Sequence, residues 1–329
     1  MGSILAKFSQ TVAGDGFGYV NINSVNGKAI FTTSNPSQTI SMEYAIDHNL
    51  DGSAIVEASR FLKLVRTFTG LVTLETKGST LMIRQGKTKC SLQIANNPIV
   101  SRLDRLPGAG TLVDLGDHLG KIAYALDNTV NTCLAYYWLN NDAIATSNGY
   151  VMTEVKLDQP IGLIACVPPL AIRDLRDKVT IRHTKNQLDI ATGNFYLSTR
   201  LVDLAFPPYR NIIPTHVNCI TLDRKGLLEI LKRAELTTDL GSVTLGIKGS
   251  ELYLKAASDI AEDEDYLMGA VTSDFTAELR ISTKYITTTL NSIGGQTVEI
   301  YIGKPTEPVV FKSPDNPSVT YLIMPVYQA

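Results

Sequence analysis

The sequence predicts an α+β fold made of repeated units, in which a helix is followed by a β-hairpin. Early in the chain, runs of alternating apolar and polar residues are typical of half-buried strands. A longer run then follows the helical period, with apolar residues three and four positions apart. A short pattern recurs along the chain, each time after a predicted helix. We therefore expect paired α+β units rather than a solenoid or uniform propeller blades.

Length and composition limit the possible classes of protein. With 329 residues, 44% of them hydrophobic, the chain is long enough for two or three domains, each with its own core. A formal charge of −2 excludes a protein that coats nucleic acid with its whole surface, so any DNA contact needs a local patch. No stretch approaches the roughly 18 apolar residues of a membrane span, and we expect a soluble, cytoplasmic chain.

Cysteine usage agrees with a reducing compartment. Four cysteines are widely spaced and form no C-x-x-C pair: Cys90, Cys133, Cys166 and Cys219. This spacing argues against a zinc site and gives no disulfide framework, so we expect reduced core residues.

The first part of the chain reads as an amphipathic run, three strands and a helix. The run covers residues 4–12, and the strands cover 18–22, 28–33 and 39–46, separated by turn pairs at Asn26-Gly27 and Asn35-Pro36. The helix covers residues 57–68 and places Phe61, Leu62, Val65 and Phe68 on one side. Three cations share its opposite face: Arg60, Lys63 and Arg66.

The segment after that helix recurs later in the chain. Val72-Thr73-Leu74 with Lys77-Gly78-Ser79 and Leu81 reappears, at the same internal spacing, as Val243-Thr244-Leu245 with Lys248-Gly249-Ser250 and Leu252. Weaker copies begin at Val179 and at Val298. Helix followed by hairpin is thus the repeating unit, although a chance likeness between ordinary α+β domains stays open.

The remaining elements complete six units, which pair into three domains. Further helices are expected at 113–128, 168–177, 222–234 and 284–292, and strands at 134–139 and 143–146. Turn-rich segments near 106–110 and 206–214 predict the boundaries. We therefore expect domains at 1–108, 109–206 and 207–329.

A proline-rich segment at residues 205–214 cannot lie in a regular helix or a central strand, and reads as a connector. Its sequence F-P-P-Y-R-N-I-I-P resembles the F-P-x-Y-R-x-[VIL]-[IL]-P connector of the bacterial replicative sliding clamps, the DNA polymerase III β subunit family. The ending Tyr321-Leu322-Ile323-Met324-Pro325-Val326 is similar to the family's Y-x-[VI]-M-P-[MV], and Arg280 to Leu290 looks like its final helix. Before residue 206 the likeness is one of order and pattern.

The resemblance implies a non-enzymatic DNA polymerase processivity factor. Such a protein has three clamp domains per chain, each with two helices packed on antiparallel sheets, and closes as a head-to-tail homodimeric ring around duplex DNA. It tethers the replicative polymerase and the clamp loader through a hydrophobic peptide groove. Two alternatives stay open: a subunit of a nucleic-acid-processing hydrolase, and a clamp-fold adaptor that does not encircle DNA.

The chain offers no catalytic or metal-binding motif. Its four histidines are isolated from cysteines and acidic motifs: His48, His118, His183 and His216. The acidic run 262–265 cannot direct four consecutive carboxylates at one ion, and we expect a solvated loop there. No cofactor and no metal are expected.

Cations on the predicted helices supply the expected DNA surface, because phosphate contacts need lysines and arginines on one face. For each helix alone, a solvated face is the plainer interpretation; several such faces on repeated units favour a basic channel. The expected set is Lys7, Arg60, Lys63, Arg66, Lys121, Arg173, Arg176, Lys178, Arg224, Lys225, Lys232, Arg233 and Lys284.

The resemblance also implies positions for the groove and the dimer contact. The groove set is Ser147, Gly149, Tyr150, Met152, Pro207, Ile212, Tyr285, Leu322, Met324, Pro325 and Val326, and the dimer contact is Leu236. In the last strand, alternation predicts that Leu322 and Met324 face the groove and Ile323 the core. Where the family has T-D-G-H-R-L, this chain has S-N-G-Y-V-M at 147–152, which indicates a divergent clamp, of a kind that a phage could encode, with its own motif preference.

Overall fold

A computed structural model describes residues 18–46, 51–96, 103–115, 118–127, 132–169, 175, 178–215, 218–272 and 275–326. The chain forms two compact units, each made of two segments. Unit 1 comprises Met1–Gly116 and Leu170–Val202, and unit 2 comprises Asp117–Pro169 and Asp203–Ala329. All strand pairs in the described residues are antiparallel, which confirms the predicted α+β class.

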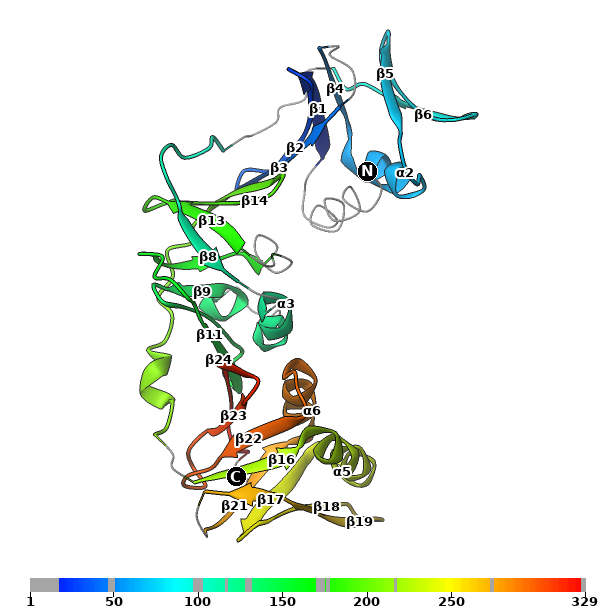
Figure 1. The fold of residues 1–329 in the computed structure, drawn as a ribbon. Coiled ribbons are helices and arrows are strands. Elements are labelled where there is room, and N and C mark those ends of the chain that lie inside the picture. Colours follow the sequence, from blue (N-terminus) through cyan, green and yellow to red (C-terminus); the bar gives the residue numbers. More distant parts are fainter. Residues whose placement is uncertain are drawn as a thin grey trace. The chain divides into compact units, whose positions relative to one another are not determined.

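Unit 1 contains an eight-stranded sheet and a three-stranded sheet (Figure 1). In sheet order, the larger sheet has β4 (Gly52–Glu57), β1 (Tyr19–Val25), β2 (Lys28–Ser34), β3 (Gln38–Ala45), β15 (Phe195–Arg200), β14 (Gln187–Thr192), β13 (Lys178–His183) and β8 (Thr111–Asp114). The smaller sheet has β5 (Thr73–Lys77), β6 (Thr80–Gln85) and β7 (Thr88–Gln93). Since β3 pairs with β15, strands from distant parts of the chain complete one sheet.

The local chemistry of unit 1 explains its elements. Asn26 and Gly27 both have positive φ, 51° and 71°, as the tight turn between β1 and β2 requires. Helix α2 (Ala58–Arg66) begins after Glu57, whose carboxylate accepts hydrogen bonds from the backbone N–H groups of Ser59 and Arg60. Its apolar stripe is buried, as the sequence predicts.

Unit 2 contains a nine-stranded sheet and a four-stranded sheet. In sheet order, the larger sheet has β12 (Ile164–Val167), β9 (Tyr137–Asn140), β10 (Ala143–Ser147), β11 (Val151–Lys156), β24 (Asn316–Ile323), β23 (Val309–Ser313), β22 (Thr297–Tyr301), β16 (Cys219–Asp223) and β20 (Ala270–Val271). The smaller sheet has β19 (Glu262–Met268), β18 (Glu251–Ala257), β17 (Ser242–Lys248) and β21 (Thr276–Ser282). The helices bounded within its described residues are α3 (His118–Ile122), η1 (Ala123–Ala125), η2 (Cys133–Ala135), η3 (Tyr209–Ile212), α5 (Arg224–Thr237) and α6 (Thr283–Ser292).

The pairing of β11 with β24 brings the middle of the chain against its C-terminal part, with Met152 opposite Leu322. The two faces of this sheet carry different partners. On one face, Thr146 Oγ1 donates to the carbonyl of Ile122 in α3, and the Tyr321 hydroxyl donates to the carbonyl of Ser292 in α6. Because side chains alternate along a strand, Leu322 points away from these helices.

Helix α5 begins after Asp223, whose carboxylate accepts from the N–H of Gly226 at 2.6 Å. Its buried stripe consists of Leu227, Ile230, Leu231 and Ala234. This stripe packs against β18 and β19, and α5 lies beside α6 (Figure 1).

The predicted internal repeat is present in the structure. Hairpins β5–β6 and β17–β18 turn through Gly78 and Gly249, whose φ angles are 56° and 58°. The weaker copy at Val179 forms hairpin β13–β14, and the one at Val298 lies in β22.

Three local predictions were wrong in part. The helix expected over 113–128 starts later, because Val113 is buried in β8 opposite Val179. Arg280 belongs to β21, so the final helix begins at Thr283. The acidic run 262–265 is an edge strand rather than a loop, since β18 pairs with it along its length. The connector agrees with its prediction, because its described residues hold one 3₁₀ turn, η3, after Pro208 and no regular helix or strand.

Some predictions stay as predictions. The amphipathic run 4–12 and most of the helix 168–177 lie outside the described residues. The three-domain division at residues 108 and 206 is one more such prediction.

Candidate peptide groove and DNA-facing helices

A cluster of buried side chains lies on the face of the nine-stranded sheet that points away from α3 and α6. Six residues from four strands and the connector of unit 2 form it: Ala145, Met152, Phe206, Tyr209, Val310 and Leu322. We call it the connector cluster, because Phe206 and Tyr209 belong to the connector, residues 205–214. The connector thus packs on this face of the sheet.

Half-buried apolar side chains border the connector cluster: Cys133, Leu134, Trp138, Ile213 and Tyr301. Trp138 stacks on Phe206 with ring centroids 5.3 Å apart and an interplanar angle of 10°. Phe206 in turn meets Tyr209 edge to face at 5.9 Å. This apolar and aromatic border is suited to hold the anchors of a short peptide.

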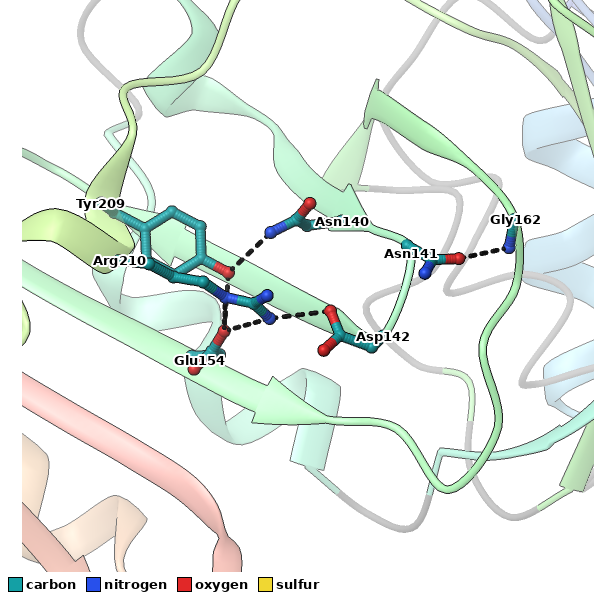
Figure 2. A network of polar contacts seen from close by, with 7 residues as sticks. All are labelled: Asn140, Asn141, Asp142, Glu154, Gly162, Tyr209 and Arg210. Carbon is teal, nitrogen blue, oxygen red and sulfur yellow. Dashed lines mark hydrogen bonds and ion pairs between the residues drawn. The ribbon is translucent and has the colours of Figure 1, made fainter.

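Figure 2 shows a polar network that attaches the connector to the sheet. Glu154 lies on β11, two residues after Met152 and on the same face, and its side chain is 4% exposed. Its Oε1 accepts three hydrogen bonds, from the Tyr209 hydroxyl at 2.7 Å and from Arg210 Nε and Nη2 at 2.9 and 2.8 Å. Two consecutive connector residues therefore share one carboxylate oxygen.

The turn between β9 and β10 completes the network. Arg210 Nη2 donates to Asp142 Oδ1 at 2.8 Å, and Asn140 Nδ2 donates to the Tyr209 hydroxyl at 3.4 Å (Figure 2). Asn141 Oδ1 accepts from the N–H of Gly162 at 2.9 Å and ties the turn to the segment before β12.

The pKa values follow these contacts. Burial raises the pKa of Tyr209 to about 12, and the Glu154 carboxylate acts in the same direction. The hydrogen bond with Asp142, followed by the bond and charge of Glu154, raises the pKa of Arg210 above its usual value. The hydrogen bond from Arg210 lowers the pKa of Asp142 below its usual value. Arg210 and Asp142 are therefore charged at neutral pH.

The loop at 147–152 is held by its own polar side chains. Asn148 Oδ1 accepts from the N–H groups of Tyr150 and Val151 at 2.9 Å, and Gly149 has a φ of 89°. This geometry leaves the Tyr150 side chain exposed, and it stacks on Tyr285 with centroids 6.2 Å apart.

The expected groove residues fall into separate groups. Met152 and Leu322 lie in the connector cluster, and Leu322 is 2% exposed. Tyr150 and Tyr285 form the aromatic pair, and the carbonyl of Tyr150 accepts from the N–H of Met324. Among the others, Pro207, Ile212, Gly149 and Val326 are exposed, Ser147 and Met324 are half-buried, and Pro325 is buried.

Sequence reasoning missed Trp138, Phe206, Tyr209, Val310, Tyr301 and Glu154. The signal for Phe206 and Tyr209 was present, because both belong to the connector motif. Trp138 and Glu154 have no local signal, since each acquires its role only when the connector packs on the sheet.

The expected DNA-contact residues differ in the hydrogen bonds and ion pairs that they make within the chain. Arg224 Nε and Nη1 donate to the carbonyls of Gly295 and Leu290 at the end of α6, and Arg233 pairs with Asp265 at 2.6 Å. Arg60 lies 3.7 Å from Glu57, with most of its side chain exposed. The remaining described members have exposed side chains: Lys63, Arg66, Lys121, Lys178, Lys225, Lys232 and Lys284. Lys7, Arg173 and Arg176 lie outside the described residues.

Leu236, the expected dimer contact, lies in the last turn of α5 and is 87% exposed. Leu240, in the loop after α5, is 71% exposed. These are large apolar side chains left in solvent by the single chain.

Within the described ranges, no group of three or more His, Cys, Asp or Glu side chains is placed to hold a metal ion. None of the helices in the same ranges is long and apolar enough to cross a membrane.

Comparison with known proteins identifies relatives. Residues 210–327 match the family described as DNA polymerase III beta subunit, C-terminal domain. A "Beta sliding clamp" of Synechococcus elongatus is 25% identical over 202 residues, 55% of this chain and 54% of the relative. A second, of Synechocystis, is 26% identical over 49% of this chain and 44% of its own length. The chain thus spans about half the length of these relatives.

Solved structures agree over nearly the whole chain. The DNA polymerase III beta subunit of Thermotoga maritima has a TM-score of 0.85 and 17% identity, covering 99% of this chain and 98% of its own. The DNA polymerase sliding clamp of Pseudomonas aeruginosa has a TM-score of 0.81 at the same identity and coverage. These structures share the fold of this chain. Residues 210–327 thus match the C-terminal domain of the DNA polymerase III beta subunit family, and the chain as a whole is similar to the beta sliding clamps in fold.

Proposed function

We propose that the protein is a non-enzymatic processivity factor, which encircles duplex DNA as a homodimeric ring and tethers a replicative polymerase through the connector cluster and its border. The observation that carries this proposal is the connector cluster itself. On the sheet face opposite α3 and α6, partly exposed apolar and aromatic side chains border this buried cluster. A protein that holds DNA and a polymerase together needs one surface for each of them.

The helices supply the DNA surface in this proposal. Exposed lysines on α2, α3, α5 and α6 offer point charges to phosphates: Lys63, Lys121, Lys225, Lys232 and Lys284. Contacts of this kind do not depend on base sequence and weaken as salt rises. A ring that slides needs this type of binding, because tight, base-specific contacts would stop it.

Two sheet edges support head-to-tail closure. In the described residues, β19 forms an edge of its sheet and exposes Glu262 and Glu264. Strand β7 forms an edge of the three-stranded sheet and exposes Lys89, next to Lys87 in the preceding turn. The acidic edge, β19, of one copy can therefore pair with the basic edge, β7, of a second copy.

Sedimentation of a Leu236→Glu variant tests the assembly. The parent is expected at twice the chain mass of 35.8 kDa, and the variant at the monomer mass, because a carboxylate would be buried against apolar surface. Ile164→Glu is the control, since Ile164 is 63% exposed and lies on β12, outside the two sheets whose edges are proposed to pair. A monomeric parent would favour an adaptor that does not encircle DNA.

A further inference from the structure

The burial of the Glu154 carboxylate, on the sheet face that carries the connector cluster, needs a physical explanation. The Glu154 side chain is 4% exposed and lies on the face of the sheet that also carries Met152 and Leu322. Burying a carboxylate is unfavourable unless it is paired and fully hydrogen-bonded, and an apolar residue of similar volume is often as stable. A contribution to stability therefore does not explain Glu154.

The partners of Glu154 indicate what it does. All three donors to its Oε1 come from Tyr209 and Arg210, in the middle of the connector. The backbone N–H groups of Tyr209 and Asn211 bond within the connector, to the carbonyls of Pro207 and Pro208. The connector is therefore attached to β11 through side chains rather than by strand pairing.

Groove residues flank this attachment on both sides. Phe206 lies three residues before Tyr209 and stacks on Trp138, and Ile213 lies three residues after Arg210 and borders the connector cluster. Since the segment is short and rich in proline, moving its middle would move both ends.

We propose that Glu154 and Arg210 are positioning residues for the peptide groove: their ion pair holds the connector on the sheet, so that Phe206 and Ile213 form a preformed wall for the partner peptide. This inference rests on the proposed function of the groove. A preformed wall raises affinity because the peptide does not have to order it on binding. Glu154 and Arg210 act through the wall and need not touch the peptide.

The chain carries its own reporter of connector position. Trp138 is the single tryptophan, and its ring stacks on Phe206 of the connector. Its fluorescence, and its quenching by acrylamide, respond to displacement of that ring. A role confined to overall stability would not change this signal in folded protein.

The test compares three full-length variants with the parent. Arg210→Gln removes the cation, and the double variant Glu154→Gln with Arg210→Gln removes both charges, so that no unpaired carboxylate is left buried. Arg105→Gln is the matched control, because Arg105 pairs with Glu43 at 2.9 Å in unit 1 with similar exposure, 48% against 43% for Arg210. The probe is a synthetic peptide covering the clamp-binding segment of a bacterial replicative polymerase, with affinity measured by calorimetry on samples whose circular dichroism matches the parent.

We expect the double variant to bind the peptide about tenfold more weakly. Trp138 should become more accessible to acrylamide in the same sample. The Arg105→Gln control should match the parent in both measurements, and Arg210→Gln should follow the double variant if it folds. Unchanged affinity, or unchanged quenching, in the folded double variant would overturn the proposal. If the parent itself does not bind the peptide, the proposed function of the groove falls and this inference falls with it.

Discussion

Two segments of the chain, 103–110 in unit 1 and the connector in unit 2, are each attached to a neighbouring sheet by a buried carboxylate, but the chemistry differs. Asp189 on β14 is fully buried and accepts from the N–H of Leu106 at 2.6 Å, from Gln187 Nε2 at 2.9 Å and from the Tyr196 hydroxyl. All three donors are neutral. In the connector, the donors to Glu154 include the Arg210 guanidinium.

The arginine of the unit 1 segment has a different position. Arg105 lies over the Tyr196 ring, 4.1 Å from its centroid, and pairs with Glu43, which is itself partly exposed. Burial alone would raise the pKa of Glu43, but the hydrogen bonds and charges of Arg105 and Lys28 hold it below its usual value. The comparison teaches that the hydrogen bonds to a buried carboxylate can come from neutral donors alone, as at Asp189, or can include a cation. Of these two attachments, only that of the connector, at Glu154, includes a cation.

The largest expected difference concerns the two arginines. Arg210→Gln should lower the free energy of unfolding by about 3 kcal/mol, because it leaves the Glu154 carboxylate buried without its cation. Arg105→Gln should lower it by less than about 1 kcal/mol, since its pair is exposed to water. Urea unfolding measures both values. Equal losses would remove the distinction between the two segments.

The next effect tests the neutral donors. Asp189→Asn should destabilise the protein by about 2 kcal/mol, because Asp189 accepts hydrogen bonds on both carboxylate oxygens, and the NH2 group of asparagine would face a donor in place of one of them. Asp104→Asn, at an exposed position of the same segment, is the control. Loss of stability in both variants to the same extent would contradict the assignment of Asp189 as the attachment point.

A smaller effect is expected at the two tyrosines. Tyr209→Phe and Tyr196→Phe each remove one hydroxyl donor and should each lower the free energy of unfolding by about 1 kcal/mol. Similar values for the two tyrosines would sharpen the comparison, because the difference in stability between the two attachments would then come from the Arg210 guanidinium. A loss confined to one tyrosine would show that the hydroxyls are not equivalent.

The smallest effect is one of pH. The pKa of Asp142 is lowered in the folded protein from its usual 3.8, so its contribution is present above about pH 3.8 and is lost as the pH falls through the folded value. The stability difference between the parent and Asp142→Asn should therefore be constant from neutral pH to about pH 5, and should shrink below about pH 3.8. A difference that grows on acidification would reverse the sign of this linkage.

Local pattern predicted much of the fold. The period of two predicted β1 to β3, and the helical period with its cations predicted α2 and its exposed face. The repeat identified hairpins with equivalent left-handed glycines, Gly78 and Gly249. These features are set by neighbouring residues, which is why sequence shows them.

The rest depends on contacts between distant residues. Glu154 lies within a run that alternates like any strand, and its partner Tyr209 is 55 residues away. Arg224 reads as an exposed cation, although it bonds to carbonyls at the end of α6. The acidic run reads as a loop until β18 pairs with it, with Lys255 opposite Glu264. Spacing alone does not supply such partners.

Retention on a linear duplex tests encirclement most directly. The protein is allowed to thread onto DNA that is fixed to a surface at one end, the free end is then either blocked or left open, and high salt is applied to remove phosphate contacts. A ring is expected to stay on the blocked DNA and to leave the open DNA. Loss at the same rate from both would contradict a clamp that encircles DNA.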